Sequence, residues 1–295
     1  MKKLDLSSII EDVSVNLLRL AVTRLPEDVK ESLEQAYRRE TSSIGREQLK
    51  AILENVRLAE ERSLPICQDT GLISFYLRAG SKFNGLECVE GAIVRAVKRA
   101  TEEIPLRPNA VDPLTEENSS DNVGRHIPHI HWRVEDGDFL EITAFPKGAG
   151  SENMSILKML QPSEGLEGLK KLVIDAIIEA GGKPCPPTIV GVGFGGGSNI
   201  AMELAKLALL EPLNVPNPDE GARELERELC EAANMTGIGP MGLGGDVTVL
   251  AVKVKYAHRH PASYPVAIAF QCWAARRATA RIYSNGEVNY LTHKI

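Results

Sequence analysis

The stretch Pro65-Ile66-Cys67-Gln68-Asp69-Thr70-Gly71 runs directly into the apolar segment Leu72-Ile73-Ser74-Phe75-Tyr76-Leu77. It separates two parts of the sequence that differ in their pattern of apolar residues. Before it, residues 1–64 carry apolar side chains at helical spacing. After it, strand-like and helix-like patterns alternate. We therefore predict an α+β fold in one compact domain, with a helical scaffold over residues 1–64 and a mixed part over residues 65–295.

Strand-like patterns follow the heptapeptide at several places. Residues 126–134 and 139–145 alternate apolar and polar side chains around the turn residues 135–138, which predicts a β-hairpin. No internal repeat and no linker divides the sequence. Further predicted helices cover residues 13–21, 27–39, 44–61, 85–104, 166–180, 200–210 and 220–233, and further strands cover residues 72–77, 188–194, 247–254 and 266–270.

Composition excludes several classes of protein. The 295 residues are 43% hydrophobic and 25% charged, as in an ordinary globular protein. A net charge of -6 argues against non-specific nucleic-acid binding and gives no support for contact with an anionic membrane. The N-terminus turns polar too early for a signal peptide, and no apolar run is long enough to span a bilayer. We expect a cytoplasmic protein.

The five cysteines are too sparse for a disulfide framework, and neither a CxxC pair nor an HxxxH pair supports a zinc site. Cys88 and Cys230 fall within helix patterns and are predicted to be structural. The other three occupy special backbone positions: Cys67 in the loop, Cys185 among prolines, and Cys272 at a strand end before two arginines. Three thiolates can hold a [4Fe-4S] cluster and leave one iron open as a Lewis acid.

Polar residues near these cysteines suit a small anionic hydroxy acid. Gln68 and Asp69 follow Cys67 directly, and Arg107 lies between prolines, where a guanidinium is well suited to grip a carboxylate. The loop Lys147–Asn153 has small residues that let backbone N–H groups approach an anion, and His260 precedes a proline.

Three other interpretations remain open at this point. A non-catalytic iron–sulfur protein would have the thiolates without a polar substrate pocket, and a nucleotide-binding α/β enzyme would use the glycines of residues 193–197. The histidines at 126, 129 and 131 could bind a metal, although polar packing or an active-site rim explains them better.

Six segments with distinctive residues follow one another in a fixed order: Leu64–Gly71, Leu106–Leu114, Lys147–Asn153, Cys185–Pro187, Gly237–Gly245 and Pro265–Arg277. Together they resemble the class I, iron–sulfur fumarate hydratase and L-tartrate dehydratase family, over a region from about residue 10 to the C-terminus. The length is similar to that of the separate α subunit of the two-subunit members. The swivelling β domain, the other half of these enzymes, is absent from this chain.

The resemblance implies roles for particular residues. Gln68, Asp69 and Arg107 would contact the dicarboxylate, with Asp69 near the departing hydroxyl, and His260 would be a supporting polar group. The cluster, with one open iron, would be ligated by Cys67, Cys185 and Cys272. The loop residues Gly148, Ala149 and Gly150 would bind substrate through backbone N–H groups, although single-chain relatives usually carry a third glycine where Ala149 stands.

The resemblance also implies a β subunit, which would supply the proton-abstracting threonine and further arginine and lysine clamps, in a heterotetramer. The expected reaction is the reversible hydration of fumarate to L-malate. Dehydration of L-tartrate to oxaloacetate is the alternative, and the residues above do not separate the two.

Overall fold

The computed structural model describes residues 5–294, which form two compact units. Unit 1 comprises residues 5–27, 55–148 and 276–294 of the described chain, and unit 2 comprises residues 28–54 and 149–275. The chain thus enters each unit more than once, so no single linker marks the division in the sequence. The α+β prediction is confirmed, because both units combine helices with a mixed sheet. That the chain acts as one domain stays a prediction.

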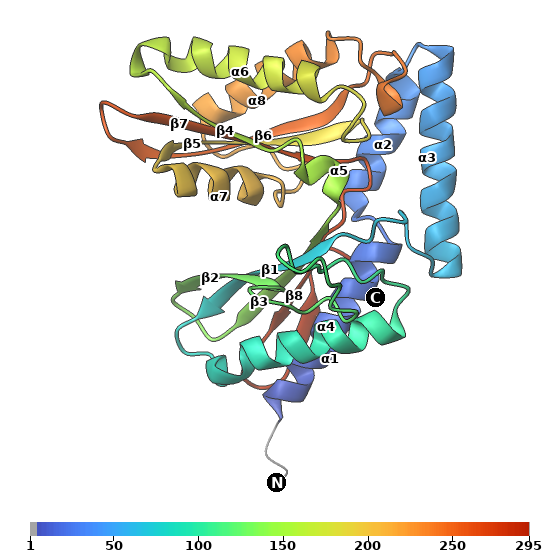
Figure 1. Cartoon of the computed structure of the whole chain (residues 1–295), viewed down its shortest axis with the longest axis vertical. Coiled ribbons are helices and arrows are strands. Elements are labelled where there is room, and N and C mark those ends of the chain that lie inside the picture. Colours follow the sequence, from blue (N-terminus) through green and yellow to red (C-terminus); the bar gives the residue numbers. More distant parts are fainter. Residues whose placement is uncertain (1–4, 295) are drawn as a thin grey trace. The chain divides into compact units, whose positions relative to one another are not determined.

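Unit 1 is a five-stranded sheet with two long helices packed on it (Figure 1). The strand order is β2-β1-β3-β8-β9. Apolar side chains of α1 and α4 form one buried core with those of β1, β3 and β8. The elements of unit 1 are α1 (Leu6–Thr23), β1 (Leu72–Gly80), η1 (Leu86–Cys88), α4 (Val89–Glu103), β2 (His129–Glu135), β3 (Leu140–Lys147), β8 (Ala278–Ile282) and β9 (Val288–Tyr290).

The predicted hairpin between residues 126–134 and 139–145 is wrong. Both segments are strands, β2 and β3, but β1 lies between them. β1 pairs in parallel with β2 and antiparallel with β3. Alternation of apolar and polar residues identifies a strand without identifying its neighbour, which is why the pattern was compatible with both arrangements. β8 and β9 do form an antiparallel hairpin.

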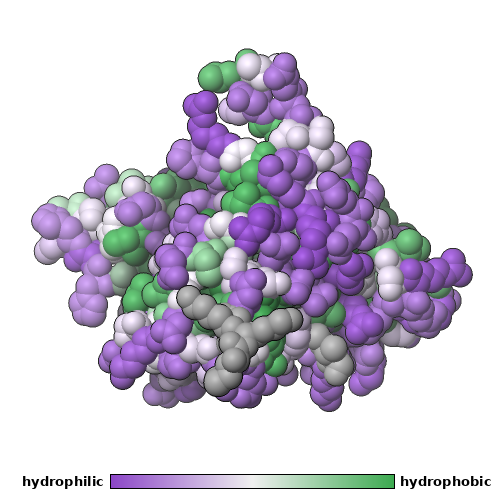
Figure 2. Space-filling model, turned by 90° about the horizontal axis from the view of Figure 1, so that it is seen from below, coloured by the Kyte–Doolittle hydropathy of each residue, from purple (hydrophilic) through white to green (hydrophobic). Residues whose placement is uncertain are grey.

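Charged residues lie on the outer side of the two helices of unit 1. Arg95 Nε contacts Glu11 at 2.8 Å, and Arg99 Nη1 contacts Asp12 at 2.8 Å, so ion pairs join α4 to α1. Seen from below, hydrophilic residues cover most of the visible face, with smaller hydrophobic patches between them (Figure 2). The buried faces of these helices, not their outer faces, hold them on the sheet.

Unit 2 is a four-stranded sheet covered on both faces (Figure 1). The strand order is β4-β7-β5-β6; α7 lies on one face, and α6 and α8 lie on the other. Helix α3 (Ser43–Arg62) belongs to unit 2 up to Glu54 and to unit 1 beyond it. The remaining elements are α2 (Glu27–Arg39), α5 (Ala149–Glu152), β4 (Ile156–Leu160), η2 (Pro162–Glu164), α6 (Gly165–Ala180), β5 (Thr188–Gly196), α7 (Ser198–Ala208), α8 (Glu220–Asn234), η3 (Pro240–Gly242), β6 (Val249–Arg259) and β7 (Tyr264–Gln271).

The glycines of β5 let α7 approach the sheet closely. A Cβ on Gly191 would lie 2.1 Å from the carbonyl oxygen of Ala205, and one on Gly193 would lie 2.1 Å from that of Ala201. Glycine is therefore required at both positions for packing alone. This contact explains Gly193 without a nucleotide, and it weakens the nucleotide-binding interpretation.

A buried carboxylate connects two distant segments of unit 2. Glu40, which is 1% exposed, follows α2, and its carboxylate accepts hydrogen bonds from the N–H groups of Ser42, Asp246 and Val247 at 2.9–3.0 Å. A Cβ on Gly245 would lie 2.7 Å from Glu40 Oε2. Glu40 thus fixes the end of the glycine-rich loop 237–245 to the segment that follows α2.

Candidate functional site

The loop that carries Cys67 is anchored within unit 1. The N–H of Ile66 donates to the carbonyl oxygen of Val22 at 2.9 Å, and Asn55 Nδ2 donates to the carbonyl oxygen of Ile66 at 2.8 Å. The half-buried Cys67 thiol lies 3.5 Å from Oε1 of the exposed Gln68. A fixed backbone therefore presents the thiol and the amide toward solvent.

Asp69 is part of a polar cluster that we name the Asp69 cluster: Asp69, Gly148 and Arg276. Asp69 Oδ1 accepts a hydrogen bond from the N–H of Gly71 at 2.9 Å, and the carbonyl oxygen of Asp69 accepts one from Arg276 Nη1 at 2.5 Å. A Cβ on Gly148 would lie 2.9 Å from Asp69 Oδ2 and 3.3 Å from Arg276 Nη2. Only glycine fits at position 148 without displacing these groups.

Arg276 was not predicted as part of the site. An arginine pair after a cysteine is usually solvated, yet Arg276 is 1% exposed and Arg277 is 3% exposed. The missed signal is position: both arginines follow the end of a buried strand within four or five residues of Cys272. Burial of Arg276 places a permanent positive charge beside Asp69 in unit 1.

Arg107 is held beside the Cys67 loop by its backbone. Its N–H donates to Thr70 Oγ1 at 3.0 Å, and its carbonyl oxygen accepts from the buried Asn122 Nδ2 at 3.1 Å. The side chain is exposed, with Nη1 3.5 Å from the carbonyl oxygen of Gln68. Unit 1 therefore brings Gln68, Asp69 and Arg107 together; their predicted roles stay predictions.

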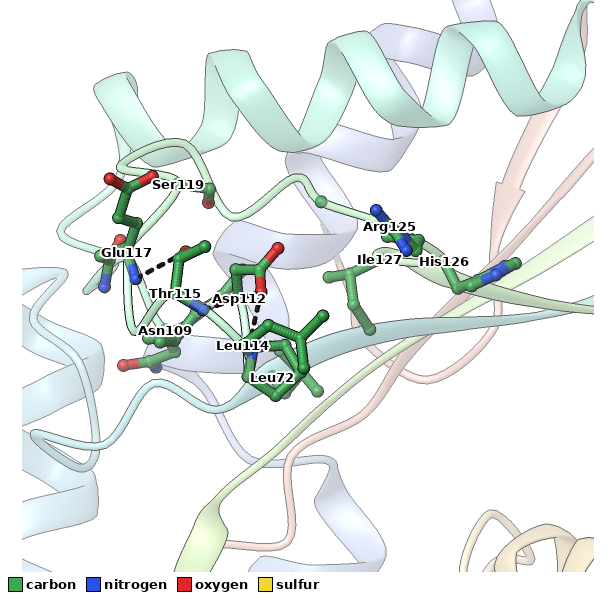
Figure 3. A pocket seen from close by; sticks show the side chains of 15 residues that line it. Leu72, Asn109, Asp112, Leu114, Thr115, Glu117, Ser119, Arg125, His126 and Ile127 are labelled. Atoms are coloured by element: carbon green, nitrogen blue, oxygen red, sulfur yellow. Dashed lines mark hydrogen bonds between the residues drawn. The ribbon is translucent and has the colours of Figure 1, made fainter.

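A cavity of about 730 Å³ lies beside this group in unit 1 (Figure 3). It is lined by Leu72, by residues 109–119 without Glu116, and by residues 124–127. Asn109 connects it to the Cys67 loop, because Asn109 Nδ2 donates to the carbonyl oxygen of Gly71 at 3.1 Å. Asp112 turns inward on its own loop and accepts the N–H of Leu114 at 2.8 Å, as Figure 3 shows. Gln68, Asp69 and Arg107 do not line the cavity.

Unit 2 brings Cys185 and Cys272 together. The N–H of Trp273 donates to the carbonyl oxygen of Cys185 at 3.2 Å, so the two cysteine-bearing segments lie side by side. Cys185 has a φ of +56°, which is rare for a residue with a side chain. Its N–H donates to the carbonyl oxygen of Gly182 at 3.1 Å. Such strain persists only where the surroundings fix it, and it is common at functional sites.

The surroundings of Cys185 are the glycine-rich loop 237–245. The N–H of Met241 donates to the carbonyl oxygen of Pro186 at 2.8 Å, and a Cβ on Gly182 would lie 3.2 Å from the carbonyl oxygen of Met241. Both cysteines are half-buried, and the Cys272 thiol lies 3.7 Å from the carbonyl oxygen of Ala274. None of the five cysteines, all within the described residues, forms a disulfide.

The predicted anion-binding loop is divided between the two units at position 149. Gly148 belongs to unit 1, whereas Ala149 begins unit 2 and the short helix α5. Gly150 lies near the cysteine loop of unit 2, because its Cβ would be 3.4 Å from the carbonyl oxygen of Lys183. Substrate binding by Gly148, Ala149 and Gly150 stays a prediction.

His260 lies apart from the cysteines of unit 2. It stands in the exposed turn before β7, where its Nδ1 accepts the N–H of Ala262 at 3.1 Å, whereas Cys272 follows the far end of that strand. Eight strand residues span about 25 Å. The structure does not bring His260 to Cys272 within unit 2, and its supporting role stays a prediction.

The histidines of β2 make ring contacts. His131 stacks on Tyr76 with ring centroids 4.3 Å apart, and His129 meets His131 edge-on at 4.2 Å. In the described part of the chain, no three His, Cys, Asp or Glu side chains converge on a position for a single metal ion. These contacts support packing as the role of this cluster.

Cys88 and Cys230 have the environments of structural thiols. The Cys88 thiol donates to the carbonyl oxygen of Gly85 at 3.0 Å, next to α4. Burial raises the pKa of the Cys230 thiol on α8, which disfavours the thiolate that binds metal.

Comparison with known proteins gives a match over most of the chain. Residues 11–281 match the family described as "Fumarate hydratase (Fumerase)". The chain belongs to this family. Fumarate hydratases add water to a carbon–carbon double bond or remove water to form one. Membership of this family therefore assigns the chain to the hydro-lyases.

Two relatives illustrate the similarity of this fumarate hydratase family member to known proteins. "Putative L(+)-tartrate dehydratase subunit alpha" of Methanocaldococcus jannaschii is 52% identical over 277 residues, which are 92% of this chain and 97% of that protein. "L(+)-tartrate dehydratase subunit alpha" of Escherichia coli strain K12 is 36% identical over 285 residues, 96% of this chain and 94% of that protein. Within residues 5–294, no helix combines the length and apolar character needed to cross a bilayer.

Proposed function

We propose that this chain is the α subunit of a [4Fe-4S]-dependent hydro-lyase that acts on a four-carbon dicarboxylic acid. The observation that carries the proposal is the gathering of Gln68, Asp69 and Arg107 beside Cys67 in unit 1. A thiol for a metal cluster, a carboxylate for proton transfer and a guanidinium for a substrate carboxylate are thereby adjacent.

The residues present fit the cluster. Cys67, Cys185 and Cys272 are the proposed ligands; each is half-buried, as a thiolate must be to reach a cluster yet remain shielded. Each thiolate in a [4Fe-4S] cluster binds a different iron, so the three sulfur atoms need not converge on one point. The rigid backbone of Cys185 further supports an oriented ligand.

The cluster, when bound, supplies an iron without a protein ligand, which polarises the substrate's C2 hydroxyl. Arg107 binds one substrate carboxylate through its exposed guanidinium. Asp69 transfers a proton at the hydroxyl oxygen as it leaves as water, and its carboxylate is oriented by the N–H of Gly71. Gln68 donates to the substrate through its exposed amide. The C3 proton is removed by a base of the β subunit.

Two substrates follow from different observations. The names of both relatives favour L(+)-tartrate, whose dehydration gives oxaloacetate after tautomerisation. The family description favours fumarate, whose hydration gives L-malate. Fumarate is the first expectation from the sequence, whereas the relatives' names make L(+)-tartrate our first candidate and fumarate our second.

The relatives' designation as α subunits supports a β subunit as partner. We propose a heterotetramer of α and β subunits in the cytoplasm, where a reducing environment preserves the thiols.

The proposal is tested by activity. The chain is produced without oxygen together with a β subunit, and formation of oxaloacetate from L(+)-tartrate and of L-malate from fumarate is measured. We expect turnover of one substrate, and a loss of kcat/KM of about 100-fold or more in Arg107→Met from the lost carboxylate contact. Arg133→Met, whose side chain is 76% exposed, is the control and keeps full activity. No turnover of either substrate by cluster-loaded protein would refute the proposal.

A further inference from the structure

Strand β7 ends in a buried side chain whose polar atoms lack partners. Gln271 is 1% exposed, and among residues 5–294 neither its Oε1 nor its Nε2 has a hydrogen-bond partner. Buried polar groups are nearly always hydrogen-bonded, because an amide removed from water without compensation destabilises the fold. The partner of Gln271 therefore lies outside the protein chain: an ordered water or a bound group.

Its position in unit 2 indicates which kind of group. Gln271 directly precedes Cys272 and pairs across the sheet with Ile189, four residues after Cys185. The hydrogen bond from Trp273 to Cys185 holds the two cysteine segments together immediately beyond it. The buried Gln271 thus belongs to the end of β7 at which the segments of Cys185 and Cys272 meet.

The two faces of β7 differ in character. Val266, Ile268 and Phe270 belong to the apolar core beneath α6 and α8. Alternation along the strand places Gln271 on the opposite face, in line with Ala267 and Ala269. An apolar residue would continue this face without any unpartnered polar atom, so packing alone does not account for an amide here.

We propose that Gln271 is a positioning residue for the cluster, and that its Nε2 donates a hydrogen bond to a sulfur atom at Cys272, either the thiolate or an adjoining sulfide. This inference rests on the proposed function. Sulfur gains negative charge when the cluster is reduced, so a donor at this point stabilises the reduced form more than the oxidised form. Loss of the donor consequently lowers the reduction potential.

The test uses the full chain with its β subunit and the variant Gln271→Met, which keeps the length of the side chain and removes both polar atoms. Two quantities are measured: the cluster's midpoint potential by a redox titration followed by electron paramagnetic resonance, and the rise in Tm when cluster-free protein is loaded. The control is Ser14→Ala, because Ser14 Oγ is another buried atom without a partner, in α1 of unit 1.

We expect Gln271→Met to shift the midpoint potential to a more negative value and to gain less Tm on loading than wild type, while its cluster-free Tm is not lowered. Ser14→Ala should match wild type in potential and in Tm gain. Gln271→Leu serves if the methionine variant does not fold; it also removes the donor and should make the potential more negative.

An unchanged potential with a wild-type Tm gain would overturn the inference and assign the amide to a water. Equal loss of Tm with and without the cluster would overturn it in favour of a purely structural role. Failure of wild type to bind a cluster would refute the proposed function itself, which separates the two results.

Discussion

The position of the Asp69 carboxylate depends on Gly148, a neighbour that has no side chain. Gly148 lies so close that a Cβ would be 2.9 Å from Asp69 Oδ2. The carboxylate is otherwise oriented by Gly71, so a methyl group at position 148 must displace either Asp69 or the backbone of Gly148. The geometry of the proposed proton transfer is therefore set by a backbone contact.

We predict that Gly148→Ala lowers kcat about 100-fold, because a displacement of about 1 Å in a catalytic group has an effect of this size. The fall in the free energy of unfolding should be about 1–3 kcal/mol from overpacking. Steady-state kinetics and urea unfolding measure the two effects. In the control Gly91→Ala, a Cβ meets only Arg95 Nη1, at 3.5 Å, so activity should be kept. Equal activity of the two variants would disprove the role of Gly148.

Single residues also show which features can be predicted from the local sequence and which cannot. Cys185 could be recognised from its prolines, because proline acts on the local backbone. The burial of Arg276 and Gln271 could not, because it depends on segments far away in the sequence. An arginine and a glutamine are solvated in most contexts, and only the packed structure shows otherwise.

The N-terminus of α8 in unit 2 is stabilised by the carboxylate of Asp219. Asp219 precedes α8, where its side chain accepts the N–H of Ala222 at 2.8 Å and the hydroxyl of Tyr256 at 2.9 Å. These hydrogen bonds lower the pKa of Asp219, with that from Ala222 as the largest cause. The stabilisation is therefore complete above the carboxyl's unfolded pKa of about 3.9 and is lost as the pH falls through the lower folded pKa.

We predict that Asp219→Ala lowers Tm at pH 7 through the lost cap, and that the difference from wild type shrinks below about pH 4. Thermal unfolding followed by circular dichroism across pH measures both. Asp175→Ala removes an exposed ion pair with Lys171 within α6 and should change Tm little. A Tm difference for Asp219→Ala that stays constant down to pH 2 would contradict the assignment.

Glu40 gives a second prediction for an element, the loop 237–245. In Glu40→Ala the N–H groups of Ser42, Asp246 and Val247 lose their acceptor, so the free energy of unfolding should fall by about 3 kcal/mol or more. Glu34→Ala is the control, because Glu34 forms an exposed pair with Arg38, worth less than about 1 kcal/mol. Urea unfolding of both variants provides the measurement, and equal losses would contradict the structural role of Glu40.

The helices could be predicted from the sequence better than the sheets. All seven predicted helices are present, as α1 to α4 and α6 to α8, because helical spacing is a local property. The helix predicted over residues 13–21 begins earlier, at Leu6, and the short helix α5 was not predicted. Strand partners are not local: the insertion of β1 between β2 and β3 joins segments more than 50 residues apart. The glycines of β5 likewise have their explanation in α7, which the strand pattern alone does not show.

The two units of the whole molecule are built from interleaved segments. Unit 2 requires residues 28–54 as well as residues 149–275, since Glu40 holds the loop of the later segment. No composition shift marks such a division, and for this reason the sequence indicated a single domain.

This arrangement predicts the behaviour of fragments. Residues 149–275 alone should be markedly less stable than the same residues in the full chain, because several N–H groups then lose Glu40. Addition of a peptide of residues 28–54 should restore stability, whereas the same peptide with Glu40→Ala should not. Chemical-shift dispersion and Tm report the outcome. A fragment as stable as the intact chain would contradict the interleaved unit.

In the proposed enzyme, three cysteines from distant parts of the chain hold one cluster. Iron, sulfide and the visible spectrum are measured on protein purified without oxygen, for wild type and for Cys67→Ser, Cys185→Ser, Cys272→Ser and Cys88→Ser. We predict about four irons and four sulfides per chain in wild type and Cys88→Ser, and a lost or degraded cluster in the other three. Absence of a cluster from reconstituted wild type, or an equal loss in Cys88→Ser, would contradict the claim.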